Sequence, residues 1–158
     1  MLTVKLICVG DLKEKYWRDA CAEYAKRLQT LCKFSIIQLK EAKMDKNPSQ
    51  TIIDKALEEE GKAILQAAEG SLIVPLCIEG KLHSSESLAK LLDNAAVRGE
   101  SSVSFIIGSS HGLAPAVKKA GTGISMSPMT FPHQLARVML CEQIYRAFQI
   151  NTGTKYHK

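Results

Sequence analysis

The sequence has little of what marks secreted, metal-binding or membrane-spanning proteins. No apolar run approaches the roughly 18 residues that a membrane helix needs. The apolar start carries Lys5 and runs into Gly10-Asp11 with no basic segment before it, so we expect no signal peptide. The cysteines are odd in number and none forms a C-x-x-C pair, which predicts reduced thiols in a cytoplasmic protein and no metal site; they are Cys8, Cys21, Cys32, Cys77 and Cys141.

Acidic residues are almost absent from the last third of the chain. Residues 1–100 carry 15 Lys and Arg against 15 Asp and Glu, whereas residues 101–158 carry six basic residues against one acid, Glu142. The whole net charge of +5 therefore lies in the last third. A local positive excess favours a polyanionic partner, because release of counterions from phosphates drives binding. A surplus that serves only solubility explains the same count equally well.

Short apolar runs alternate with helical patterns along the whole chain. Strands are expected at 2–9, 34–39, 72–78, 103–107 and 123–126. Helices are expected around 17–31, at 48–68 with Asn47 as N-cap, from Ser84-Ser85 to Gly99, briefly after Gly112, and at 133–150. The 158 residues suit one α/β domain with a mainly parallel sheet, helices on both faces and ligands beyond the carboxyl ends of the strands. We expect the loops after Ile78, Ile107 and Met126 to lie near one another there.

The last predicted helix, residues 133–150, is apolar almost all round. Its polar residues fall in two stripes, His133 with Arg137, and Glu142 with Arg146 and Gln149. A helix that is apolar on both flanks must be covered on both flanks. One flank suits the sheet, and for the other we expect a second copy of the chain, as in a homodimer.

The segment Phe105-Ile-Ile-Gly-Ser-Ser-His-Gly112 predicts a tight turn between a strand and a helix. Its glycines allow the backbone to approach a ligand closely. The same letters match G-x-S-x-G, the nucleophile elbow of serine hydrolases, with Ser110 as nucleophile and Glu142 and His157 as partners in the right order. A short sheet and the simpler pairing of Glu142 with Arg146 make this hydrolase the weaker alternative.

Two further segments combine groups that bind nucleotides. The loop from Ile124 to His133 carries Met126, Met129 and Phe131, which are able to line a slot for an adenine, although such residues more often only pack. The end of the chain, Thr152–Lys158, joins an aromatic ring, an imidazole and lysines. It therefore offers base stacking and phosphate binding together, although chain ends are usually silent.

Taken in order, these residues resemble a known family. The resemblance rests on Gly10, Leu76, Ile107-Gly108, Gly112-Leu113, the 126–133 loop, Arg137, Glu142, Tyr145-Arg146-Ala147 and Tyr156-His157. It is to the bacterial large-subunit (23S) rRNA pseudouridine N3-methyltransferases of the SPOUT class, the RlmH family, and it covers essentially the whole chain. Two positions depart from the family: Ser109 stands where a second glycine is frequent, and His111 where other residues are common.

The resemblance implies a single SPOUT domain over 1–158 with a C-terminal trefoil knot, and cofactor and RNA functions concentrated in 103–158. It also implies a cytoplasmic homodimer that acts on rRNA in the assembled ribosome, with no metal and no membrane. The implied cofactor is S-adenosyl-L-methionine, held by Leu76, Gly108, Met126, Ser127, Pro128, Met129, Thr130 and Phe131. Catalytic residues at or near the RNA would be His133, Arg137, Arg146, Tyr156 and His157.

The implied reaction is direct transfer of the cofactor's methyl group to N3 of a pseudouridine. The imide must lose its proton, so a base or a cationic environment is needed. His133 and His157 are both candidates for the base, and Arg137 and Arg146 are candidates to stabilise the anion. A ribosome- or RNA-binding factor without catalytic activity remains the alternative that explains the basic last third without a cofactor.

Overall fold

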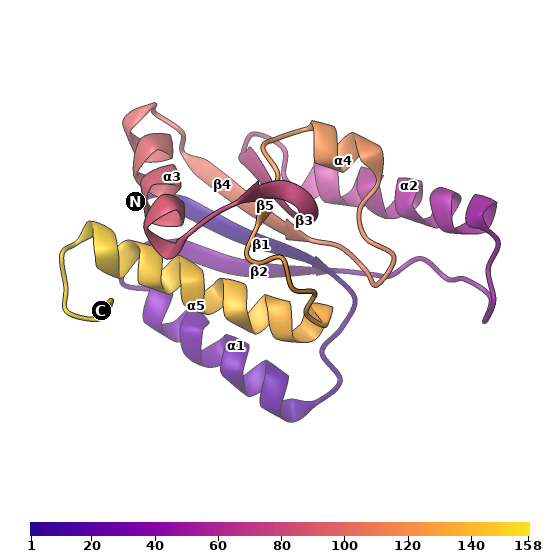
Figure 1. The fold of residues 1–158 in the computed structure, drawn as a ribbon, viewed down its shortest axis with the longest axis horizontal. Helices are drawn as coiled ribbons and strands as arrows, with labels where there is room; N and C mark the ends of the chain where they lie inside the picture. Colours follow the sequence, from indigo (N-terminus) through magenta and orange to yellow (C-terminus); the bar gives the residue numbers. More distant parts are fainter.

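The computed structural model describes residues 1–158 as ten helices and strands in alternation (Figure 1). The strands are β1 (Thr3–Val9), β2 (Lys33–Leu39), β3 (Leu72–Leu82), β4 (Ser102–Ile107) and β5 (Ile124–Ser125). The helices are α1 (Lys15–Leu28), α2 (Gln50–Ala67), α3 (Ser85–Val97), α4 (Pro115–Lys119) and α5 (His133–Asn151). Ser84 caps α3 as expected, but the N-cap of α2 is Ser49 and not Asn47, because the Ser49 hydroxyl accepts from Ile52 N–H.

All strand pairs are parallel, in the order β2-β1-β4-β3-β5, which confirms the predicted parallel α/β sheet. β3 extends beyond its predicted end at Ile78, because Lys81 and Leu82 pair with Ile124 and Ser125 of β5. The parallel arrangement brings the carboxyl ends of the strands to one edge, where the loops after Ile107 and Ser125 meet.

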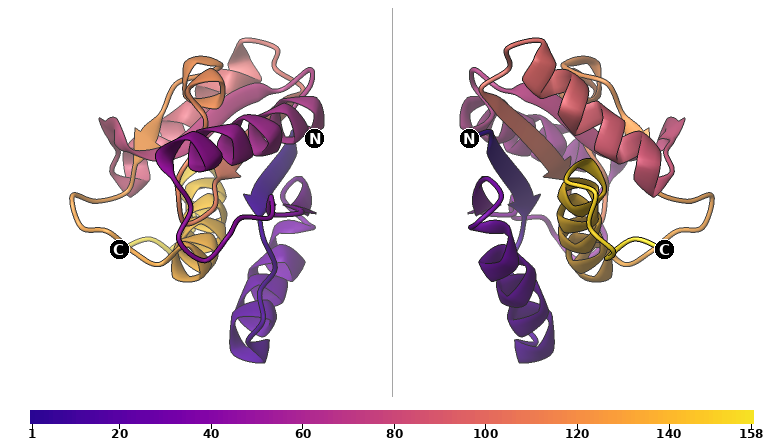
Figure 2. Two further views of the ribbon diagram at one scale, coloured as in Figure 1. Left: turned by 90° about the vertical axis from the view of Figure 1, so that its right-hand side faces the viewer. Right: turned by 90° about the vertical axis from the view of Figure 1, so that its left-hand side faces the viewer.

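Helices cover both faces of the sheet (Figure 2). Helices α1, α3 and α5 pack on one face, and α3 and α1 both lie against α5. Helices α2 and α4 pack together on the other face, over Ile7 and Ile106. None of the helices is long and apolar enough to cross a membrane.

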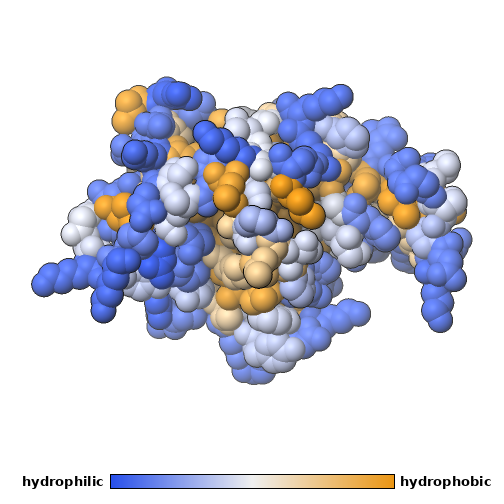
Figure 3. All heavy atoms as spheres, viewed as in Figure 1, coloured by the Kyte–Doolittle hydropathy of each residue, from blue (hydrophilic) through white to orange (hydrophobic).

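The longest helix, α5, runs from the carboxyl edge of the sheet back toward the edge where the chain starts (Figure 1). Its 19 residues correspond to about 28 Å at 1.5 Å per residue. Apolar atoms gather in the middle of this side of the molecule, over α5 and the strands above it, between hydrophilic margins (Figure 3). The two ends of α5 therefore belong to different regions of the surface.

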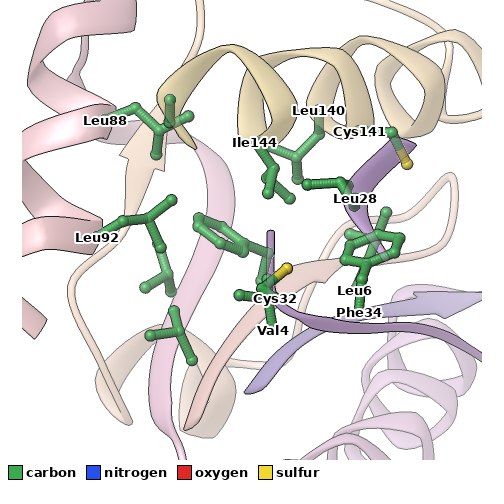
Figure 4. Packing of buried hydrophobic residues seen from close by; sticks show 14 of the residues in the cluster. Val4, Leu6, Leu28, Cys32, Phe34, Leu88, Leu92, Leu140, Cys141 and Ile144 are labelled. Atoms are coloured by element: carbon green, nitrogen blue, oxygen red, sulfur yellow. The ribbon is translucent and has the colours of Figure 1, made fainter. Parts of the chain in front are cut away.

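The larger core lies between the sheet and the three helices of the α1 side (Figure 4). Leu88 and Leu92 of α3 and Leu140 and Ile144 of α5 converge there and are at most 4% exposed. Burial of a leucine or isoleucine side chain is worth about 1.5–3 kcal/mol, so this cluster fixes α5 firmly on the sheet.

The chain that leads into β5 runs so close to β3 that only glycine fits at positions 80 and 121. A Cβ added at Gly121 would lie 2.7 Å from the carbonyl carbon of Ile73, and one at Gly80 would lie 2.7 Å from the backbone of Gly123 and Ile124. Contacts this short do not occur between real Cβ atoms and backbone. The segment that leads into the 126–131 loop is thereby held against β3.

Candidate functional site

A cavity of about 650 Å³ opens at the carboxyl edge of the sheet, within the usual size range of a cofactor site. It brings together the middle of β3, the end of β4 with the turn after it, the loop after β5 and the start of α5. Seven of the eight residues expected to hold the cofactor line it: Leu76, Gly108, Met126, Ser127, Met129, Thr130 and Phe131. The eighth, Pro128, belongs to the same loop but does not line the cavity.

The turn after β4 forms one wall of the cavity. A Cβ added at Gly108 would lie 2.8 Å from the carbonyl carbon of Gly112 and closer still to its oxygen, so position 108 has no room for a side chain. Gly112 has φ +93°, a left-handed conformation that favours glycine, and its N–H donates to Ser109 O at 2.9 Å. At Gly108 this turn presents backbone to a ligand, and Ser109, Ser110 and His111 line the cavity beside it.

The 126–131 loop forms the opposite wall and is held by short-range hydrogen bonds. The Ser125 hydroxyl donates to Ser127 O at 3.1 Å, and the Ser127 hydroxyl accepts from Met129 N–H at 3.0 Å. Met129 is 74% exposed at the rim. The loop is thus ordered by its own serines and offers an apolar rim over the cavity.

The charges of the ionisable groups that line the cavity nearly cancel. Glu79 forms a salt bridge with Lys118, and this partner lowers the pKa of the Glu79 carboxyl. His133 also lines the cavity, and partial burial, followed by the charge of Arg137, lowers its pKa. An imidazole with a lowered pKa is neutral near pH 7. The cavity therefore suits a ligand that carries little net charge on its buried part.

Arg137, which the resemblance implies at or near the RNA, lies in the interior of the chain. It is only 2% exposed, and its guanidinium donates to Gln38 Oε1 at 2.9 Å and to Gly10 O at 3.0 Å. The turn of α5 that carries Arg137 faces the sheet, whereas His133, which shares its polar stripe, lies at the cavity. Arg137 thus links α5 to the ends of β1 and β2 and does not reach the surface.

A second polar cluster lies farther along α5, from Glu142 onward. Arg146 donates from Nε and Nη2 to the two carboxylate oxygens of Glu142, both at 3.0 Å, and this bond raises the pKa of the Arg146 guanidinium. Tyr156 donates its phenol to Glu142 at 2.8 Å, and the Arg146 guanidinium stands 4.8 Å from the centre of its ring. Burial, reinforced by the Glu142 bond, raises the pKa of Tyr156 to about 12.

His157 joins this cluster to α3. Its Nε2 lies 2.7 Å from Glu86 Oε1, and its Nδ1 lies 3.2 Å from Arg146 Nη1. The cluster of Glu86, Glu142, Arg146, Tyr156 and His157, here called the tail cluster, contributes none of the cavity's lining. The structure therefore divides the predicted site into a cavity with His133 and a tail cluster with Arg146, Tyr156 and His157.

Residues 2–157 match the family described as "Predicted SPOUT methyltransferase". The chain belongs to the SPOUT methyltransferase family. Within it, the chain matches proteins named ribosomal RNA large subunit methyltransferase H. It is 46% identical to the one from Levilactobacillus brevis, 47% to that from Clostridium acetobutylicum and 48% to that from Streptococcus thermophilus, in each case over 99% of this chain and 100% of the relative. These identities over full length make it a member of the methyltransferase H group, as the sequence resemblance predicted.

Solved structures support the SPOUT fold. A methylase family protein from Neisseria gonorrhoeae superposes with a TM-score of 0.52 at 16% identity, covering 99% of this chain and 86% of that one. TrmJ from Z. mobilis gives 0.53 at 11% identity, covering 93% and 70%. At such low identities the likeness concerns the fold alone.

Within one chain, the geometry does not support the hydrolase alternative. A Ser-His-acid arrangement needs the imidazole within hydrogen-bond reach of the serine hydroxyl. Ser110 lines the cavity, whereas both ring nitrogens of His157 are engaged in the tail cluster. Glu142 is occupied by Arg146 and Tyr156.

Sequence reasoning missed several residues around these two regions. Lys118 and Glu79 face each other at the cavity although they lie on different elements, and Glu86 meets His157 from 71 residues away. No local pattern marks such partners, since the fold alone brings them together. Glu86 carried one weak signal, its place in the first turn of α3, where acids are favoured for helix stability.

Proposed function

We propose that this chain transfers the methyl group of S-adenosyl-L-methionine to N3 of a pseudouridine in large-subunit ribosomal RNA. Membership of the methyltransferase H group supports this proposal, because the relatives are named for large-subunit rRNA methylation and align over their full length. The RNA would be met in the assembled ribosome, and the work of the enzyme would then lie in the cytoplasm.

The cavity fits this cofactor in size and in chemistry. The side-chain-free turn at Gly108 and the 126–131 loop offer backbone N–H and C=O groups to an adenine and a ribose. Leu76, Met126 and Phe131 supply apolar contact for the purine. The cofactor carries the activated methyl group, so the chain's own task is to orient the two reactants and to remove one proton.

We propose that the enzyme works as a homodimer paired through the α5 side. A groove of about 500 Å³ runs beside α5, lined by Tyr24, Met126, Val138 and Met139 among others. No residue of α5 from 133 to 150 is fully exposed even in the single chain, and apolar atoms gather over this side (Figure 3). An apolar helix flank with such a groove suits a self-complementary partner around a two-fold axis.

Antiparallel pairing of the two α5 helices would complete the site. In one chain the cavity lies at the start of α5, whereas Glu142 and Arg146 of the tail cluster lie about 14–20 Å farther along the helix than His133. A two-fold axis that crosses α5 between these two positions would bring the tail cluster of each protomer toward the cavity of its partner. The basic last third of both chains would then surround the RNA.

Within such a site, His157 is the better candidate for the base. His133 has a lowered pKa and lines the cavity, but no hydrogen bond orients its ring. Contacts to both ring nitrogens orient His157, one of them with Arg146. The proton of N3–H would pass to His157 Nδ1, and the electron pair of the N3–H bond would stay on N3. The bound cofactor would supply the methyl group that N3 takes up, with the electron pair of the C–S bond staying on sulfur.

One observation carries the proposal: seven of the expected cofactor residues converge on a single cavity around Gly108. Calorimetry with S-adenosyl-L-methionine tests it. Wild-type protein should bind, and Gly108→Val should lose binding because a side chain there enters the turn. Met129→Ala, at an exposed rim position that folding does not need, should weaken binding severalfold. Well-folded wild type that fails to bind refutes the proposal.

Mixed dimers test the shared site. Gly108→Val and His157→Ala should each be inactive on ribosomes when alone. Unfolded and re-associated together in equal amounts, they should recover about a quarter of wild-type activity, because half of the dimers are mixed and each mixed dimer has one intact site. If mixed dimers are verified by mass and no activity returns, the cavity and the tail of the same chain form each site.

A further inference from the structure

The contacts of His157 fix which of its nitrogens carries the proton. The Arg146 guanidinium has only donors, so His157 Nδ1 must accept at 3.2 Å. Glu86 presents a carboxylate whose pKa is lowered, chiefly by the hydrogen bond from His157. An ionised carboxylate only accepts, so Nε2 must donate at 2.7 Å. The ring is thus held as the neutral tautomer with its lone pair on Nδ1.

Resting on the methyl-transfer function proposed above, we infer that Glu86 is a positioning residue for His157. Its carboxylate holds the Nε2 proton, so that Nδ1 is the basic atom, and it faces the positive charge that forms when Nδ1 takes the N3 proton. The proton moves from N3 to Nδ1, the Nε2 proton stays between His157 and Glu86, and the electron pair remains on N3. Glu86 touches neither substrate nor cofactor.

The surroundings of Arg146 are consistent with this role. Its Nε and Nη2 are occupied by Glu142, which leaves Nη1 as the only nitrogen bonded to the imidazole. An imide presents an N–H donor flanked by two carbonyl acceptors. N3–H would therefore replace Nη1 on Nδ1, and Nη1 would turn to a flanking carbonyl, where its charge stabilises the anion.

The charges that face His157 come from two helices and from the tail itself. α3 supplies Glu86, and α5 supplies Glu142 and Arg146, which neutralise each other. Tyr156 stacks under Arg146 and is bonded to Glu142. Glu86 is the one carboxylate in direct contact with the imidazole. Its side chain is 60% exposed, so the fold does not depend on it and variants will be folded.

The test measures methyl transfer to ribosomes that lack this modification, with the dimeric enzyme and labelled S-adenosyl-L-methionine. Glu86→Ala should lower kcat about tenfold or more, with the cofactor Kd and the KM for ribosomes unchanged. Glu86→Gln, which keeps an acceptor oxygen, should recover part of the loss. Asp93→Ala, another exposed acid on α3 without an ion pair, is the matched control and should behave as wild type.

A double-mutant cycle with His157→Ala separates the outcomes. If Glu86 acts through His157, the double variant has the same residual activity as His157→Ala alone. The inference is overturned if the activity losses of the two single variants multiply in the double variant. It is also overturned if Glu86→Ala raises the KM for ribosomes and leaves kcat unchanged, because Glu86 would then only help the tail to dock. If Glu86→Ala is active while His157→Ala is inactive, the role of Glu86 is refuted and the proposed function is not. A fully active His157→Ala sinks the base assigned under the proposed function.

Discussion

Arg137 Nη2 donates a hydrogen bond at 3.0 Å to the carbonyl oxygen of Gly10, 127 residues earlier in the chain. The guanidinium is buried without a salt bridge, and its second bond goes to the neutral amide of Gln38. A buried cation is costly unless its donors are satisfied; here Nη1 and Nη2 are bonded, whereas Nε has no partner. This arrangement therefore makes Arg137 a structural clasp between α5 and the ends of β1 and β2.

Arg137→Ala should destabilise the protein by about 3 kcal/mol, because it leaves the Gly10 carbonyl unsatisfied and opens a cavity. Arg137→Met should cost roughly half as much, since it refills the volume and removes a buried charge. Urea unfolding monitored by circular dichroism measures both. Unfolding midpoints equal to that of wild type would refute the clasp.

Stability should fall when the pH drops below about 6.5, the ordinary histidine value. Burial lowers the pKa of His83, and burial with the charge of Arg137 lowers that of His133. A depressed folded-state pKa means that the unfolded chain binds protons first, so stability is present above the ordinary value and is lost as pH falls through the folded one.

Urea midpoints measured between pH 7.5 and 5 check this pH dependence. The double variant His83→Gln with His133→Gln should show a flatter profile than wild type. In Arg137→Met, the pKa of His133 should rise, which proton NMR of the imidazole resolves. An unchanged profile in the double variant would show that the acid sensitivity has another origin.

Most of the fold was predictable, because alternation of β-branched runs and helical stripes is a local signal. The predicted five strands and five helices all exist, with ends shifted by a few residues. The longer β3 was missed since Lys81 and Leu82 become strand only by pairing with Ile124 and Ser125, more than forty residues later. The trefoil knot, which local patterns do not encode, stays a prediction from resemblance.

The site was predictable in its composition but not in its arrangement. Glycines and an apolar loop mark backbone that faces a ligand, and these converge on the cavity as expected. Arg137 and His133 share a stripe four residues apart, yet one turns inward and the other toward the cavity. The same periodicity gives no hint of Glu86 beside His157, because that contact depends on how α3 and α5 pack.

Glu142→Gln should lower the pKa of Tyr156 from about 12 toward the ordinary tyrosine value. Burial is the larger cause of the raised pKa and would remain, but the bond to a charged acceptor would be lost. Ultraviolet absorbance titration between pH 9 and 13 follows the phenol, and Tyr156→Phe identifies its contribution among the four tyrosines. A Tyr156 titration unaffected by Glu142→Gln would exclude the 2.8 Å bond.

Gly121→Ala should destabilise the protein by about 3 kcal/mol or more, because its Cβ would be driven into the backbone of Ile73. Gly70→Ala is the control: nothing lies within 4 Å of the added Cβ, and only its φ of +76° is strained, at a cost of about 1 kcal/mol. Thermal unfolding of both variants gives the comparison. Equal losses would mean that the chain before β5 does not lie this close to β3.

The separation of the cavity from the tail cluster has a consequence for how activity depends on the amount of protein. Because the tail cluster contributes none of the lining of its own chain's cavity, an isolated chain would, under the proposed shared site, hold cofactor without His157 beside it. On dilution below the dimer dissociation constant, activity per molecule would then fall in proportion to concentration, while cofactor affinity persists. In the cell, enzyme at low concentration would then be almost inactive, and total methyl transfer would rise as the square of the enzyme concentration.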